Sequence, residues 1–174
     1  MKKIILFFLL VSVFSNAQEK ENKDVFNVAR FGTVEEMKLL ESKNQDTINA
    51  TNPAGFTPLI LACYKGNTAV ATYLIPKVKD INFNTSSGSA LAAASVKGNV
   101  ALAKLLLENK ANPNLADGSG MTPLLYAIQF KNKELVELLL KFKADKKLAD
   151  NSGKSPFEYA IFTKNQEIIN LFKN

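Results

Sequence analysis

Histidine is absent from this 174-residue sequence, and cysteine occurs once, as Cys63. The absence of histidine removes the commonest general base and the commonest metal ligand of proteins. A single cysteine cannot form an intramolecular disulfide, so the fold must be stabilised by packing. We therefore expect a chain that is not an enzyme and that binds no metal or cofactor.

A hydrophobic run long enough to span a membrane is also lacking. The longest apolar stretch is Ile4–Phe14, which is well short of the ~20 residues of a membrane-spanning helix. It follows Lys2 and Lys3, and Ser15-Asn16-Ala17 then places small residues at positions −3 and −1 of a cleavage site. This is the layout of a secretory signal peptide. The alternative, a membrane anchor, is disfavoured by the polar residues that follow at once.

The sequence thus predicts a signal peptide over residues 1–17 and a mature domain over residues 18–174. The protein is expected to be exported, either to the periplasm of a bacterium or into the medium. After cleavage it would keep no stable membrane anchor, since the residue directly after the cleavage site is Gln18 and not a cysteine that could carry a lipid.

A concentrated patch of basic residues is the third feature that is missing. The net charge of +6 falls to +4 once Lys2 and Lys3 are removed, and the remaining lysines are spread along the chain. Binding to nucleic acid needs a basic stripe, so we expect no nucleic-acid partner. The length fits one domain with a core of its own, and we expect a monomer.

What the sequence does contain is an internal repeat. Four six-residue segments begin 32, 33 and 33 residues apart, and a degenerate copy lies at residues 24–31. The four segments are Thr57–Ala62, Ser89–Ala94, Thr122–Ala127 and Ser155–Ala160. Each is followed by glycine or lysine, then by asparagine or threonine, and then by a second apolar segment. The period predicts a repeated structural unit.

Each unit is expected to form two short helices. A Thr or Ser before Pro starts the first helix, because the hydroxyl accepts from free backbone N–H groups and Pro gives up a donor that the helix does not use. Gly32, Gly66 and Gly98 are expected to end it in a left-handed conformation. Lys131 and Lys164 replace this glycine, at roughly 1 kcal/mol of strain each. Helices this short persist only when neighbouring units stack.

This pattern resembles the ankyrin repeat, with its Thr-Pro-Leu-x-x-Ala start, its Gly-Asn turn and its Leu-Leu ending. The resemblance implies an all-α solenoid of about five helix-turn-helix units joined by extended turns. The units are residues 22–49, 50–82, 83–114, 115–147 and 148–174. The family's histidine after Thr-Pro-Leu is replaced throughout, so its hydrogen-bond network is missing. The third unit is one residue short near Gly88, so its turn is expected to differ.

Three local patterns could indicate chemistry, and the repeat explains each one. Ser152–Ser155 is similar to the end of a phosphate-binding loop, but Leu148 stands where the motif needs its first glycine. Asp117–Gly120 could begin a calcium loop, yet the next acidic residue is Glu134, so a turn is favoured. Cys63 could be a nucleophile, but it lacks a histidine and occupies a small inner position, which favours a buried thiol.

The resemblance also implies where a partner binds: on the first helices and turn tips, which together line a concave groove. The candidate residues are Phe31, Phe56, Tyr64, Lys65, Lys97, Met121, Phe130, Lys154 and Phe162. Beside them, Arg30, Val96, Gln129 and Thr163 are placed in the groove by the same register. Exposed aromatic side chains usually mark a binding surface. The alternative is that these rings cover the seams between units as peripheral core, and the lysines favour a partner with an acidic surface.

The sequence is thus interpreted as an exported, non-catalytic protein-interaction module that binds a protein through its concave face. Two alternative functions also consist of binding a protein. One is an inhibitor or immunity protein that blocks a toxin or an enzyme, and the other is an accessory factor of an exported enzyme, for example one acting against oxidants. A catalyst in its own right would need a constellation of residues that the sequence does not contain.

Overall fold

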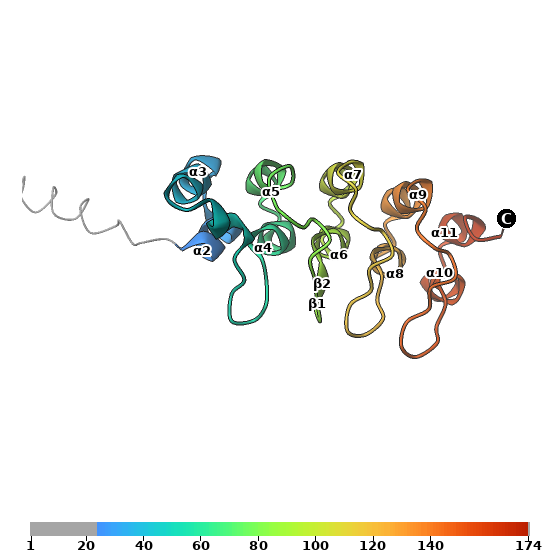
Figure 1. The fold of residues 1–174 in the computed structure, drawn as a ribbon. Coiled ribbons are helices and arrows are strands. Elements are labelled where there is room, and N and C mark those ends of the chain that lie inside the picture. The colour runs from blue at the N-terminus through green and yellow to red at the C-terminus, as the bar shows by residue number, and fades with distance from the viewer. Residues whose placement is uncertain (1–23, 174) are drawn as a thin grey trace, which may run out of the picture.

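The computed structural model describes residues 24–173, which form a row of helix pairs (Figure 1). The first helices of the pairs are α2 (Val25–Phe31), α4 (Pro58–Lys65), α6 (Ala90–Val96), α8 (Pro123–Gln129) and α10 (Pro156–Thr163). The second helices are α3 (Val34–Lys43), α5 (Thr68–Leu74), α7 (Val100–Glu108), α9 (Lys133–Lys141) and α11 (Gln166–Asn170). The expected signal peptide, residues 1–17, lies outside the described residues.

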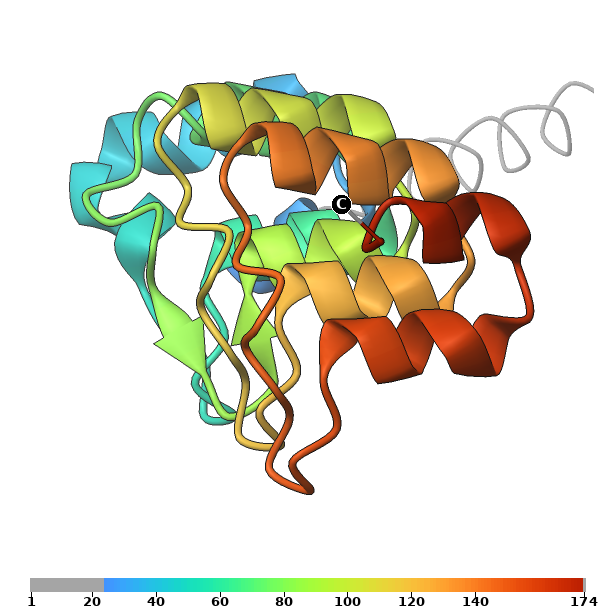
Figure 2. The same cartoon turned by 90° about the vertical axis from the view of Figure 1, so that its right-hand side faces the viewer.

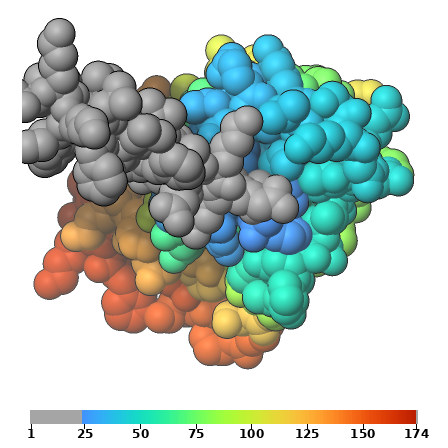
Figure 3. All heavy atoms as spheres, turned by 90° about the vertical axis from the view of Figure 1, so that its left-hand side faces the viewer, coloured from blue at the N-terminus to red at the C-terminus, as the bar shows by residue number. Residues whose placement is uncertain are grey.

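The helices form two layers. Each first helix packs on the first helix of the next pair, and the second helices form a parallel row above them (Figure 1). Between pairs, the chain runs through loops that project beyond the layer of first helices (Figure 2). Seen from its N-terminal end, the first pair lies beside the loop that leads into the second (Figure 3). The predicted all-α repeat solenoid is confirmed.

Two short elements interrupt this pattern. A 3₁₀ helix, η1 (Gln45–Asn49), follows α3. The strands β1 (Asn84–Thr85) and β2 (Gly88–Ser89) pair antiparallel as a tight hairpin before α6. This hairpin occurs in the unit that is one residue short, so the expected difference in its turn is present.

The first helices begin as the sequence predicts. The hydroxyl oxygens at the four starts each accept from the backbone N–H three residues on, at 3.3 Å: Thr57 from Ile60, Ser89 from Ala92, Thr122 from Leu125 and Ser155 from Glu158. Proline occupies the first turn of α4, α8 and α10. A capping box formed by Thr33 and Glu36 starts α3.

The turns between paired helices confirm the predictions except at Gly32. Gly66, Gly98, Lys131 and Lys164 are left-handed, with φ of 75°, 65°, 57° and 55°. Gly32 is extended instead, with φ −88° and ψ −173°, so the expectation of a left-handed residue there is wrong. Glycine is needed at this position for space. A Cβ would lie 2.8 Å from the Val28 backbone and 2.7 Å from a Glu36 carboxylate oxygen.

The repeated asparagines connect neighbouring units. Those after the first-helix turns cap the second helix and donate to the preceding unit: Asn67 to Gly32 O at 2.9 Å, Asn99 to Thr68 Oγ1 at 3.0 Å, and Asn132 to Gly98 O at 3.3 Å. Those at the unit ends accept from the next unit: Asn49 from Lys79 N, Asn82 from Asn112 N, and Asn114 from Asp145 N, at 2.7–2.8 Å. The recurring asparagines therefore satisfy backbone groups at each of the first three junctions between units.

Cys63 lies in the core between the helix layers and has no exposed surface. Ala29 and Ser95 occupy the same position in the units on either side, and both are equally buried. Burial disfavours the thiolate and raises the pKa of the Cys63 thiol to about 12. The thiol is therefore protonated near neutral pH, as expected of a structural cysteine.

Candidate protein-binding groove

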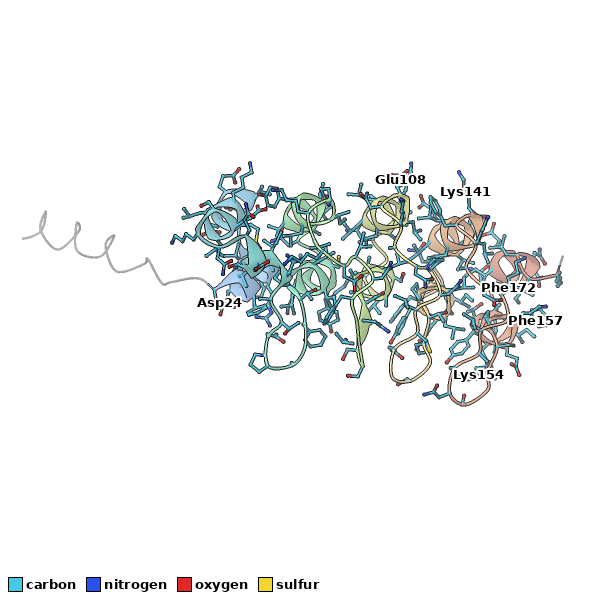
Figure 4. The ribbon with its side chains drawn as sticks, viewed as in Figure 1. Asp24, Glu108, Lys141, Lys154, Phe157 and Phe172 are labelled. Atoms are coloured by element: carbon cyan, nitrogen blue, oxygen red, sulfur yellow. The ribbon has the colours of Figure 1, made fainter. Side chains whose placement is uncertain are left out.

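The predicted aromatic residues lie along the inner layer, and four of the five are exposed. The exposed fractions are 72% for Phe31, 48% for Tyr64, 53% for Phe130 and 71% for Phe162. Phe56 is half-buried and packs against the core, so the interpretation as peripheral core applies to this ring alone. Lys65 and Lys97 are exposed, and Lys154 is half-buried. Figure 4 shows Lys154 at the loop that precedes α10.

Two of the predicted groove residues are buried instead of exposed. Met121 is only 8% exposed, and the Tyr159 hydroxyl of the next unit lies 3.3 Å from its sulfur. Thr163 is also buried, and its hydroxyl donates to Ala160 O at 2.6 Å. Both side chains have a partner in the protein, Tyr159 of the next unit for Met121 and a carbonyl of its own helix for Thr163. The repeat pattern in the sequence predicts where Met121 and Thr163 lie in their units, but it does not predict these two contacts.

A hollow of about 620 Å³ lies between the first helices and the loop tips of the N-terminal half. Its lining includes the predicted residues Phe56, Tyr64 and Lys65, together with Arg30 and Val96. Other lining residues did not stand out in the sequence, namely Asn52, Ala54, Ile60, Leu61, Ser87, Ala93 and Tyr126. Ile60 occupies the position of the family's histidine, so the apolar replacement of that residue forms part of the hollow.

Lysine side chains lie over the exposed rings. The Nζ atom of Lys65 is 5.4 Å from the centre of the Phe31 ring, and that of Lys97 is 4.9 Å from the Tyr64 ring. In the last unit, Lys154 Nζ lies 4.6 Å from the Phe162 ring. These cation–π contacts are within the range that stabilises such pairs. They hold positive charge at defined points along the groove.

Acidic residues at the loop tips act as turn residues. One carboxylate oxygen of Asp117 accepts from the backbone N–H groups of Ser119 and Met121, and the other accepts from the Tyr126 hydroxyl. Asp150 repeats this arrangement with Ser152, Lys154 and Tyr159. The turn interpretation of Asp117–Gly120 is therefore confirmed, and Ser152–Ser155 lies in the corresponding turn of the last unit. The tyrosines connect loop to helix, a role that could have been inferred from their identical position in two units.

These hydrogen bonds change the acidity of the groups involved. Bonds from Ser152, Tyr159 and the Lys154 backbone hold the pKa of Asp150 well below its usual range, because they favour the charged carboxylate. The bond to Asp150 and partial burial raise the pKa of Tyr159 to about 12. Burial and Asp117 raise the pKa of Tyr126 to about 12 as well.

The lowered pKa of Asp150 predicts a pH-dependent stability. The charged carboxylate stabilises the fold above the ordinary carboxyl pKa of 3.8, and this stabilisation is lost as the pH falls through the lower pKa of the folded state. Asp150→Asn should therefore lower the melting temperature at pH 7 and lower it less at about pH 2. Tyr159→Phe, which removes one donor, should weaken the same pH dependence in part. Thermal unfolding followed by circular dichroism measures both effects, and a difference independent of pH would contradict the assignment.

Helix pairs stacked in one row, with loops projecting from one side, define a solenoid of repeats, a class whose members commonly bind partners on an extended concave surface. The family model described as ankyrin repeats (3 copies) matches this chain twice, over residues 25–117 and 90–174. The chain therefore belongs to the ankyrin-repeat family. Proteins of this family are typically non-catalytic modules of protein–protein interaction.

Relatives of known name are similar over part of the chain. Ankyrin repeat and SAM domain-containing protein 6 of Rattus norvegicus is 30% identical over 107 residues, which are 60% of this chain and 12% of that protein. Protein fem-1 homolog A-like of Mus musculus is 34% identical over 89 residues, which are 51% of this chain and 14% of that protein. This chain thus matches only a small part of the length of these relatives.

Among residues 24–173, no three or more Cys, Asp and Glu side chains gather closely enough to hold a metal ion. Within the same residues, no helix has the length and apolar character needed to cross a membrane.

Proposed function

We propose that this chain is an exported, non-catalytic ankyrin-repeat protein of five units that binds another protein through the groove of its first helices. The observation that supports this most directly is the exposure of Phe31, Tyr64, Phe130 and Phe162, all at the first helices of the stack. Large exposed aromatics are costly in water and supply much of the contact energy of protein interfaces. The protein acts as a monomer and uses no cofactor, metal or nucleic acid.

Export is supported by the N-terminal pattern of Lys2, Lys3, the apolar stretch Ile4–Phe14 and the small residues before Gln18. It places the mature domain, residues 18–174, in a bacterial periplasm or in the medium without a membrane anchor. Whether binding inhibits the partner or assists it follows from the identity of the partner. A toxin would indicate an immunity protein, and an exported enzyme would indicate an inhibitor or an accessory factor.

A triple variant, Tyr64→Ala, Phe130→Ala and Phe162→Ala, tests the groove. We expect capture of the partner from the native envelope fraction to fall by at least about 100-fold, since interface aromatics contribute on the order of 2 kcal/mol each. The free energy of unfolding should change by less than about 1 kcal/mol, because exposed rings contribute little to the core. Affinity capture with mass spectrometry and chemical denaturation give the two readouts.

Leu39→Ala is the matched control, because Leu39 is 57% exposed but lies on α3 in the outer layer. Capture should be unchanged in this variant. Loss of several kcal/mol of stability in the triple variant would show instead that the rings belong to the core.

A further inference from the structure

The charged side chains are distributed differently on the two faces of the stack. All ion pairs recorded for residues 24–173 lie on the second helices or on the segments that follow them: Lys77–Glu41, Lys79–Asp46, Lys104–Glu108, Lys133–Glu137 and Lys133–Glu167. Figure 4 shows Glu108 and Lys141 on the outer side of this layer. These lysines have their counter-charges within the protein.

The cations of the groove are not neutralised in this way. Within the described residues, Lys65 and Lys97 form no ion pair, and their ammonium groups lie over the rings of Phe31 and Tyr64. Arg30 contacts the amide oxygen of Asn27 at 3.5 Å, which carries no charge. The nearby carboxylate of Asp117 is occupied by hydrogen bonds to its own turn and to Tyr126. The groove therefore presents positive charge that a partner can neutralise.

The hollow of about 620 Å³ combines this charge with an apolar base. Ile60, Leu61 and Ala93 line it and are almost fully buried, while Arg30 and Lys65 line it as cations, and none of its lining residues carries a carboxylate. Pockets of this size that are mostly apolar, with a few polar groups, usually hold a specific group of a ligand. The exposed aromatics continue beyond the hollow to Phe130 and Phe162, which suits an extended chain better than a small molecule.

We propose that this hollow binds a bulky apolar side chain in an acidic segment of the partner protein, and that the carboxylates beside that side chain contact Arg30, Lys65 and Lys97. The inference rests on the proposed function and specifies the chemistry of the partner. Buried apolar anchors supply affinity, while complementary charge sets orientation and association rate.

Selection of random twelve-residue peptides from a display library on the purified mature domain tests the proposal. The enriched peptides should carry a large apolar residue with Asp or Glu within about three positions of it. Synthetic versions, labelled with fluorescein, should bind at least tenfold more weakly when the apolar residue is changed to Ala or the acids to Lys. Their affinity should also fall as salt is raised, as expected for opposite charges.

Two variants of the protein locate the binding site. Val96→Phe should fill the hollow, and Arg30→Gln with Lys65→Gln should remove its cations; each should weaken the selected peptides at least tenfold. Lys77→Gln with Lys79→Gln makes the same charge change in the outer layer and should leave binding unchanged. Circular dichroism and melting confirm that each variant is folded.

The proposal is overturned if no peptides are enriched, if the enriched peptides lack the acidic and apolar combination, or if Val96→Phe binds them equally well. Such an outcome is distinguishable from failure of the proposed function. Capture of the native partner that depends on Tyr64, Phe130 and Phe162 would uphold groove binding even when the peptide selection fails. If the triple alanine variant captured the native partner as well as the unchanged protein does, groove binding itself would be refuted.

Discussion

Gly120→Ala is expected to destabilise the protein much more than Gly55→Ala or Gly153→Ala. The three glycines occupy corresponding turns and have nearly the same φ, 79°, 83° and 81°. A side chain in this region costs about 1–2 kcal/mol whatever surrounds it. Only Gly120 is also crowded, because a Cβ there would lie 2.5 Å from Asn151 N and 2.9 Å from the Asp150 carbonyl carbon. At Gly55 and Gly153 the same Cβ meets nothing within 4 Å.

The crowding arises because the loop of the last unit rests on the loop before it. Asn151 N donates to Ser119 O at 3.1 Å, and the Asn151 side-chain amide donates to Gly118 O at 2.9 Å. A methyl group at Gly120 would force these loops apart and break both hydrogen bonds. We therefore expect Gly120→Ala to cost about 3 kcal/mol or more, against about 1–2 kcal/mol for each of the other two. Equilibrium denaturation of the three variants measures the difference, and equal losses would show that the loops do not pack as described.

Repeated positions made much of this fold predictable. The Thr or Ser starts, the Thr33 capping box and the left-handed Lys131 and Lys164 follow from local rules, because each depends on hydrogen bonds or backbone sterics within a few residues. The repeated asparagines recur at fixed positions in the units, but the groups to which they bond across the junctions do not follow from that spacing. Local patterns that recur in register are therefore sufficient for the architecture.

Predictions failed where a residue's surroundings decided the outcome. Gly32 is required by the close approach of Val28 and Glu36, not by its own dihedral angles. Met121 is buried because Tyr159 of the next unit lies against its sulfur. One difference concerns positions on which no prediction was made: Phe157 and Ile161 correspond to the buried Leu59 and Cys63, yet they are 40% and 49% exposed, since no further first helix is described on the far side of α10.

The sequence predicts which side of the first helices carries the candidate groove, but it does not predict the hollow within that side. The register of the repeat places Tyr64, Lys65 and Phe130 on the exposed side of the first helices, where the structure also has them. The hollow itself is lined jointly by the loop residues Asn52 and Ser87 and the helix residues Ala93 and Tyr126, which come from three different units. The relative positions of residues from different units cannot be predicted from the sequence spacing within one unit.

Changing four lysines to glycine is expected to stabilise the protein. Lys110, Lys131, Lys143 and Lys164 are left-handed, with φ of 71°, 57°, 66° and 55°. Each side chain pays about 1 kcal/mol or more for this conformation, because its Cβ approaches the following carbonyl. Part of the gain is offset because glycine gives the unfolded chain more conformational freedom. The sites belong to separate turns, so their effects should add.

The quadruple variant should gain about 3 kcal/mol, which corresponds to roughly 10 °C in melting temperature for a chain of this size. Lys97→Gly is the matched control: Lys97 also ends a first helix, but its φ is −82°. There the left-handed strain is absent, and glycine should lower stability by up to about 1 kcal/mol. A melting series over the single and combined variants separates the two cases. If Lys97→Gly stabilised the protein as much as Lys131→Gly, the gain would come from loss of charge in a basic chain and not from relief of backbone strain.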